Sequence, residues 1–309
     1  MALPFYRGLR AHYPNAHLTL LSKENLAGFY FPEIFDAQWI LKKSESKFPL
    51  GLFRAAIALR ASKFDLGINL PASLSSAFLL WAAKIPARVG YAETVARLFL
   101  TVPLPWLGVE AKRHKAQLYL DLLDFLTATT TLLTLPPALR ENSEKLIVVA
   151  PGAAIALREW PYFATLIQDL KLAYRDHRVV VVGSRLEAKW HELLAPLKAI
   201  GVEDAVESTS LRELKALCER AAVVVANDSG VAHLAATLAG APTVVLFGPG
   251  NPDYVKPLGH GVPVLVGRVG GVPCSPCESA VCRAPYGYQK CLKALSPENV
   301  IALVAQLLR

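Results

Sequence analysis

Residues 221–252 read AAVVVANDSGVAHLAATLAGAPTVVLFGPGNP, and this stretch decides the fold. Its opening residues are apolar and rich in β-branched side chains, which is typical of a strand buried on both faces. The polar run 227–230 then breaks the pattern with residue types that cap helices and permit tight turns. Residues 231–239 predict a helix that Gly240 ends, and residues 243–247 predict a second strand. The stretch therefore predicts a strand–loop–helix–strand unit of a parallel α/β sheet.

The loop before this helix predicts an anion-binding site. A helix N-terminus at the carboxyl end of a parallel strand presents free N–H groups and the positive end of a dipole, and phosphate is its usual ligand. Ser229 adds a hydroxyl, Gly230 lets a ligand approach the backbone, and His233 lies one turn inside the helix. The alternative is a plain strand–helix crossover with a capped helix and a packed histidine.

The length of the chain predicts two domains. Its 309 residues are too many for one ordinary domain and suit two of about 150. Strands and helices are expected to alternate in both halves, so each half should be a doubly wound parallel sheet. Breakers near residue 140 place the boundary there. We therefore expect an N-terminal domain over residues 1–140 and a C-terminal domain over residues 141–309.

The composition predicts an anionic ligand. The formal net charge is +8 and the pI is about 9.2. Nucleic acid is disfavoured, because the basic residues are scattered and no known nucleic-acid motif occurs. No apolar run approaches the roughly 20 residues that span a bilayer, and five cysteines without a secretory signal favour a reducing compartment. We expect a cytoplasmic protein that can rest on a membrane surface.

The order of the motif residues adds a family resemblance. Asp228-Ser229-Gly230-x-x-His233, followed by FGP at 247–249, resembles the nucleotide-sugar site of the ADP-heptose:lipopolysaccharide heptosyltransferases, glycosyltransferase family 9. The resemblance is greatest to members of the second-heptose type. It implies an inverting glycosyltransferase with the GT-B fold, in which two Rossmann-like domains face a cleft. It also implies ADP-heptose as donor, the phosphorylated lipid A-core as acceptor, peripheral contact with the inner membrane, and no required cofactor.

The resemblance also assigns donor-binding residues. The family has a PGA…K-x-W-P pattern whose basic residue grips the donor phosphates, and Arg158 takes that position here. Arginine keeps the charge and adds bidentate geometry. In the preceding loop Ala153 and Ala154 replace hydroxyl residues, which leaves main-chain donors only. The alternative for Arg158 is a surface cation beside Glu159.

Other donor contacts follow from the same resemblance. Glu187 matches the family's ribose-binding glutamate, and the alternative is an acid that complements a helix dipole. Asp228 is expected to order the loop, and His233 to support the phosphates or the departing group.

Scattered cations in the N-terminal half are candidate acceptor contacts, because the resemblance makes this domain face the phosphorylated acceptor. The alternative is that they are solvated surface charges. The candidates are Lys23, Arg54, Arg60, Arg88 and Lys115.

The start of the chain departs from the family pattern. A doubly wound domain should begin with a strand, but this sequence begins with a predicted helix. In the family the turn after that strand carries the proposed general base, an aspartate, which would lie upstream of Met1. The resemblance therefore assigns no catalytic base in this sequence. One alternative is that the start of the chain is placed too late or that the chain is truncated, and another is a non-catalytic or degenerate nucleotide-sugar-binding protein. A dinucleotide-dependent dehydrogenase is disfavoured, because no G-x-G-x-x-G follows a predicted strand.

Four cysteines near the C-terminus form a compact motif. Four thiols in so short a span can complete a tetrahedral zinc site. The same pattern occurs in family members, and disulfides are the alternative explanation. We expect no catalytic metal. The candidate structural zinc ligands are Cys274, Cys277, Cys282 and Cys291.

Overall fold

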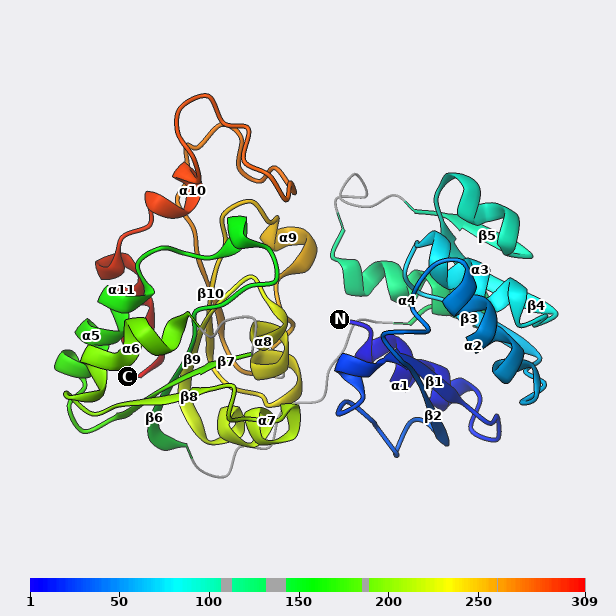
Figure 1. The fold of residues 1–309 in the computed structure, drawn as a ribbon, viewed down its shortest axis with the longest axis horizontal. Helices are drawn as coiled ribbons and strands as arrows, with labels where there is room; N and C mark the ends of the chain where they lie inside the picture. Colours follow the sequence, from blue (N-terminus) through cyan, green and yellow to red (C-terminus); the bar gives the residue numbers. More distant parts are fainter. Residues whose placement is uncertain (107–112, 132–142, 185–188, 260, 309) are drawn as a thin grey trace. The chain divides into compact units, whose positions relative to one another are not determined.

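A computed structural model describes most of the chain, namely residues 1–106, 113–131, 143–184, 189–259 and 261–308. The chain forms two compact units, Ala2–Leu133 and Thr134–Arg309 (Figure 1). The expected domain boundary at residue 140 lies outside the described residues. Among the helices that the structure describes, none combines the length and apolar character needed to cross a bilayer.

The C-terminal unit is built on a six-stranded parallel sheet of order β8-β7-β6-β9-β10-β11. Its strands are β6 (Glu144–Ala150), β7 (Arg178–Gly183), β8 (Val202–Val206), β9 (Ala221–Asn227), β10 (Thr243–Leu246) and β11 (Val264–Gly267). Numbered along the chain, this is the 3-2-1-4-5-6 order of doubly wound nucleotide-binding folds. The strand order reverses between β6 and β9. The loops that follow these two strands therefore meet at the position where such sheets bind ligands.

Helices cover both faces of this sheet (Figure 1). One face carries α5 (Phe163–Ala173), α6 (Trp190–Lys198) and α11 (Pro297–Leu307), and the other carries α7 (Leu211–Arg220) and α8 (Gly230–His233). The side chains of β9 from Val223 onward are fully buried, because helices cover them on both sides. Shorter elements complete the unit: η4 (Ala156–Arg158), the π-helical turn η6 (Leu234–Leu238), α9 (Pro252–Val255) and α10 (Lys290–Lys293).

The N-terminal unit contains two parallel sheets, β1-β2 and β3-β4-β5. The strands are β1 (Thr19–Lys23), β2 (Ala37–Leu41), β3 (Leu66–Asn69), β4 (Ala87–Ala92) and β5 (Val102–Pro105). The expected strand upstream of Met1 stays a prediction. The helices are α1 (Leu3–His12), η1 (Glu24–Leu26), α2 (Leu50–Arg60), α3 (Leu74–Ala82), η2 (Thr94–Phe99) and α4 (Lys115–Thr127). Helix α1 packs beside α4, and α2 packs beside α3.

The predicted α/β class with parallel sheets is confirmed, whereas one local prediction needs correction. The helix expected over residues 231–239 begins at Gly230, and only its first turn is α-helical before the π-helical η6. Ser229 occupies the N-cap position of α8, but its hydroxyl makes no capping hydrogen bond. The backbone N–H groups at this helix start therefore have no side-chain cap from Ser229.

Candidate functional site

Asn227, at the end of β9, anchors the loops at the point where the strand order reverses. Its side chain is fully buried. Its Nδ2 donates to the carbonyl of Pro151 at 2.6 Å, and its Oδ1 accepts from the backbone N–H of Trp160 at 3.0 Å. A buried amide without partners costs about 1–3 kcal/mol, so these bonds hold the loop after β6 against β9. From the sequence, Asn227 was only a break in an apolar pattern.

An ion pair between a half-buried arginine and a buried aspartate lies beside this anchor. Arg158 Nη1 is 2.8 Å from Asp228 Oδ2, and the Asp228 side chain is only 6% exposed. Burial raises the pKa of the Asp228 carboxyl, the Arg158 guanidinium opposes that rise, and Glu278 adds to it. Arg158 Nε is buried and makes no hydrogen bond within the described part of the chain. The pair brings together two predicted donor-site residues, which lie far apart in the sequence.

Glu278 is a second acid at this pair, and its role was not predicted from the sequence. Its carboxylate oxygen Oε2 is 3.9 Å from Arg158 Nη2. Its other oxygen accepts the backbone N–H of Asn251, and its own N–H donates to the carbonyl of Pro249 at 2.8 Å. Glu278 also has a left-handed backbone, with φ of 51°. These contacts place two carboxylates around the Arg158 guanidinium.

Gln289 holds the backbone that carries Arg158. Its side chain is buried, and its Nε2 donates to the carbonyls of Leu157 at 3.0 Å and Glu159 at 2.7 Å. These carbonyls belong to the residues on either side of Arg158. The orientation of the Arg158 turn therefore depends on a residue more than a hundred positions away in the chain. The role of Gln289 was not predicted from the sequence either.

The start of α8 presents open space beside the ion pair. Gly230 is exposed, and a Cβ added to it would meet no atom within 4 Å. Ser229 Oγ is buried and has no hydrogen-bond partner among the described residues. Gly250 is packed tightly instead, since a Cβ there would lie 2.3 Å from Asp228 Oδ2. A ligand in front of Gly230 can therefore hydrogen-bond to the Ser229 hydroxyl and to the backbone N–H groups at the start of α8.

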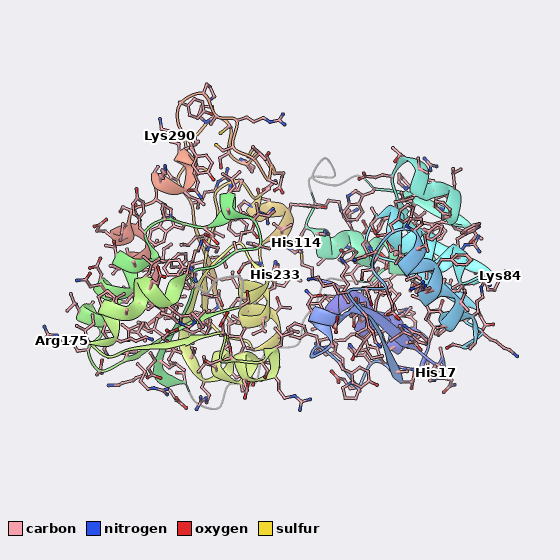
Figure 2. The ribbon with its side chains drawn as sticks, in the orientation of Figure 1. His17, Lys84, His114, Arg175, His233 and Lys290 are labelled. Carbon is pink, nitrogen blue, oxygen red and sulfur yellow. The ribbon has the colours of Figure 1, made fainter. Side chains whose placement is uncertain are left out.

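The structure describes only some of the other residues that were predicted to contact the donor. Ala153 is half-buried and Ala154 is exposed in the loop after β6. His233 lies at the end of α8 and is half-buried (Figure 2). Glu187 lies outside the described residues, so its ribose-binding role stays a prediction.

The predicted acceptor residues come from β1, α2, β4 and α4 of the N-terminal unit: Lys23, Arg54, Arg60, Arg88 and Lys115. Arg60 donates twice to the carbonyl of Ala82, from Nε at 3.0 Å and from Nη2 at 2.7 Å. Arg88 Nε donates to the carbonyl of Phe99 at 2.8 Å. Both guanidinium groups therefore hold backbone segments together. Acceptor contact by the five residues stays a prediction.

The four clustered cysteines, Cys274, Cys277, Cys282 and Cys291, line a single cavity of about 320 Å³. None of the cysteines that the structure describes forms a disulfide. Within the same described ranges, no group of three or more His, Cys, Asp or Glu side chains is placed to hold a metal ion. A backbone hydrogen bond from Gln289 lowers the pKa of Cys282, whereas burial raises the pKa of Cys291. The structural zinc stays a prediction.

Comparison with known proteins shows to which family the chain is similar. Residues 52–286 match the model of glycosyltransferase family 9 (heptosyltransferase). Lipopolysaccharide heptosyltransferase 2 of Salmonella typhimurium is 24% identical, over 100% of this chain and 94% of that protein. Lipooligosaccharide heptosyltransferase 2 of Haemophilus influenzae is 27% identical, over 84% of this chain and 82% of that protein.

Solved structures show the same fold. The structure of ADP-heptose lps heptosyltransferase II from E. coli superposes with a TM-score of 0.76 at 23% identity, over 99% of this chain and 93% of that one. The crystal structure of a family 9 glycosyl transferase from Veillonella parvula gives a TM-score of 0.81 at 23% identity, over 99% of this chain and 92% of that one. The family match covers most of the chain, and the chain belongs to glycosyltransferase family 9, the heptosyltransferase family.

Proposed function

We propose that this chain transfers heptose from ADP-heptose to the phosphorylated inner core of lipopolysaccharide. The observation that carries the proposal is the pair of Arg158 with the buried Asp228, beside the open helix start at Gly230, in a member of the heptosyltransferase family. The relatives named above are heptosyltransferases of the second type, which supports the same donor and acceptor. A dinucleotide-dependent dehydrogenase has no comparable support.

The donor diphosphate would bind in front of Gly230. The backbone N–H groups at the start of α8, the hydroxyl of Ser229 and the guanidinium of Arg158 would donate hydrogen bonds to its oxygens. Asp228 would hold Arg158 in place as a positioning residue. Main-chain donors at Ala153 and Ala154 would complete the cradle.

The sugar and nucleoside ends of the donor have their own predicted contacts. His233 would support the phosphates or the departing group, and Glu187 would accept hydrogen bonds from the ribose hydroxyls. On the acceptor side, the N-terminal cations would meet the phosphates of the lipid A-core. This acceptor is anchored in the inner membrane, so we place the protein on its cytoplasmic face.

The reaction would be a single displacement with inversion. The acceptor hydroxyl oxygen attacks the anomeric carbon of heptose, and the bond from that carbon to the diphosphate oxygen breaks. ADP leaves with the bonding electrons, and the hydroxyl proton passes to a base. Arg158 and the helix start would stabilise the charge that develops on the departing diphosphate. The residue that acts as this base is not assigned.

A transfer assay across nucleotide sugars tests the proposal. The full chain is incubated with heptose-deficient lipid A-core and with ADP-heptose, an ADP-hexose or a UDP-sugar, and the acceptor is analysed by mass spectrometry. We expect one added heptose with ADP-heptose, and much less product with Arg158→Ala. Efficient transfer from a UDP-sugar and none from ADP-heptose would contradict the proposed donor.

A further inference from the structure

An exposed apolar face lies on the N-terminal unit, outside the candidate donor site. We define the apolar face as Phe48, Leu50, Phe53, Ile57, Trp81 and Leu98. Three of these residues, Leu50, Phe53 and Ile57, follow one side of α2 at helical spacing. Monomeric proteins rarely expose a contiguous set of large apolar side chains without a binding role.

Ring contacts link the aromatic side chains of the face from Phe48, just before α2, through α3 to η2. Phe48 and Phe78 rings lie 5.2 Å apart, and Trp81 and Phe99 rings lie 5.3 Å apart. Phe78 joins the two pairs, with its ring 5.6 Å from Trp81 and 5.5 Å from Phe99. Leu98 precedes Phe99 and is 77% exposed. The half-buried rings of Phe78 and Phe99 thus form a floor from which the exposed side chains project.

Positively charged residues flank the apolar face. Residues 42–100 contain 9 Lys and Arg and only 3 Asp and Glu. Lys47 and Arg97 are exposed and directly precede two of the apolar residues in sequence. The Arg60 guanidinium lies 5.9 Å from the centre of the Phe53 ring. Exposed aromatic and aliphatic side chains flanked by cations are the combination that binds the headgroup region of an anionic bilayer.

A basic cavity opens at the ends of α2 and α3. It has a volume of about 390 Å³, and its lining includes Arg60, Lys63 and Lys84 against one acid, Asp65. Lys84 lies just past the end of α3 (Figure 2). A lipid phosphate is of a size and charge that this cavity can accept.

We propose that the apolar face docks the enzyme on an anionic membrane surface. The inference deepens the proposed function, from which it takes only that the acceptor is lipid-anchored. A second copy of the chain is the less suitable partner, because a symmetric interface across this face would bring its cations together. A bilayer with anionic headgroups complements both the apolar side chains and the charge.

Vesicle binding tests the inference with the full chain. Co-sedimentation is measured with phosphatidylcholine vesicles that contain about one third phosphatidylglycerol, and with phosphatidylcholine alone. We expect binding to the anionic vesicles only, with a steep loss at about 0.5 M salt. Inorganic phosphate at matched ionic strength should not displace the protein, which separates a bilayer from a free phosphate ligand.

Two variants and a matched control locate the surface. Leu50→Gln/Ile57→Gln/Leu98→Gln should weaken the partition coefficient on the order of 100-fold, because three apolar side chains no longer enter the headgroup region. Lys47→Gln/Arg97→Gln should weaken it about 30-fold at low salt. The control, Leu172→Gln/Leu193→Gln, changes exposed leucines of the C-terminal unit and should bind like the parent chain.

Other outcomes separate this inference from the proposed function. Transfer to a delipidated core oligosaccharide is measured on the same proteins and should be equal in all of them. Transfer without any vesicle binding would overturn the docking surface and leave the heptosyltransferase assignment intact. Equal vesicle binding by the apolar triple variant and the control would also overturn it. Specific vesicle binding without transfer would support the surface and count against the proposed function alone.

Discussion

Replacing Glu278 with glutamine should tighten ADP binding. In the structure, Glu278 and Asp228 both lie against the Arg158 guanidinium, so one cation faces two carboxylates. A diphosphate brings further negative charge to the same guanidinium. It therefore competes with Glu278 for Arg158 and is repelled by the Glu278 carboxylate. Glutamine removes the charge and keeps an oxygen that can accept the backbone N–H of Asn251.

The distance between the Arg158 guanidinium and the Glu278 carboxylate sets the size of the expected gain in ADP binding. Unit charges 3.9 Å apart attract by about 4 kcal/mol at an effective dielectric constant of about 20. Water reaches both partners, since the Arg158 and Glu278 side chains are 23% and 27% exposed. Ion pairs that water reaches contribute up to about 1 kcal/mol. Releasing Arg158 from this competition should therefore lower the Kd for ADP about five-fold.

Calorimetric titration with ADP measures this change. Glu159→Gln is the matched control, because Glu159 directly follows Arg158 but its carboxylate pairs with Lys189. We expect the control to bind ADP like the parent chain. Titration with AMP should show a smaller gain for Glu278→Gln, since AMP carries less negative charge. Unchanged or weaker ADP binding by Glu278→Gln would refute the competition between Glu278 and the diphosphate.

Three further predictions concern the same site and the cysteine cavity. Gly230→Leu should leave the melting temperature unchanged, since the added side chain meets open space, yet weaken ADP binding at least about ten-fold by filling the proposed phosphate position; an unchanged Kd would move the phosphates elsewhere. Asn227→Ala should lower the free energy of unfolding in urea by about 2 kcal/mol, because it strands buried backbone groups at Pro151 and Trp160; a loss below about 0.5 kcal/mol would contradict the anchoring role. If the predicted zinc is present, elemental analysis should find about one zinc per chain, absent from Cys274→Ser/Cys277→Ser; equal metal content in both proteins would contradict it.

Much of the C-terminal unit could be predicted from local sequence. The apolar runs of β6, β7 and β9 are buried on both faces, as such runs indicate. The helix that ends at Gly240 was predicted because glycine tolerates a left-handed backbone, and Gly240 has φ of 61°. The π-helical turn at Leu234–Leu238 could not be predicted, because its sequence is that of an ordinary apolar helix.

The residues whose hydrogen bonds hold the loops of the candidate site could not be predicted in the same way. Asn227 binds Trp160 across 67 positions, and Gln289 binds Leu157 across 132 positions. Long-range hydrogen bonds of this kind leave no periodic pattern in the sequence. A polar residue that ends a wholly apolar strand was the one available signal for Asn227. For Glu278, nothing in the sequence beyond its position beside a cysteine indicated a role at the site.

The most direct test of the account is a crystal structure of the full chain with ADP bound. We predict phosphate oxygens within hydrogen-bond distance of both the Arg158 guanidinium and the backbone N–H of Gly230, which follows β9. Density for the phosphates at any other position, with Arg158 still held by Asp228 and Glu278, would contradict it.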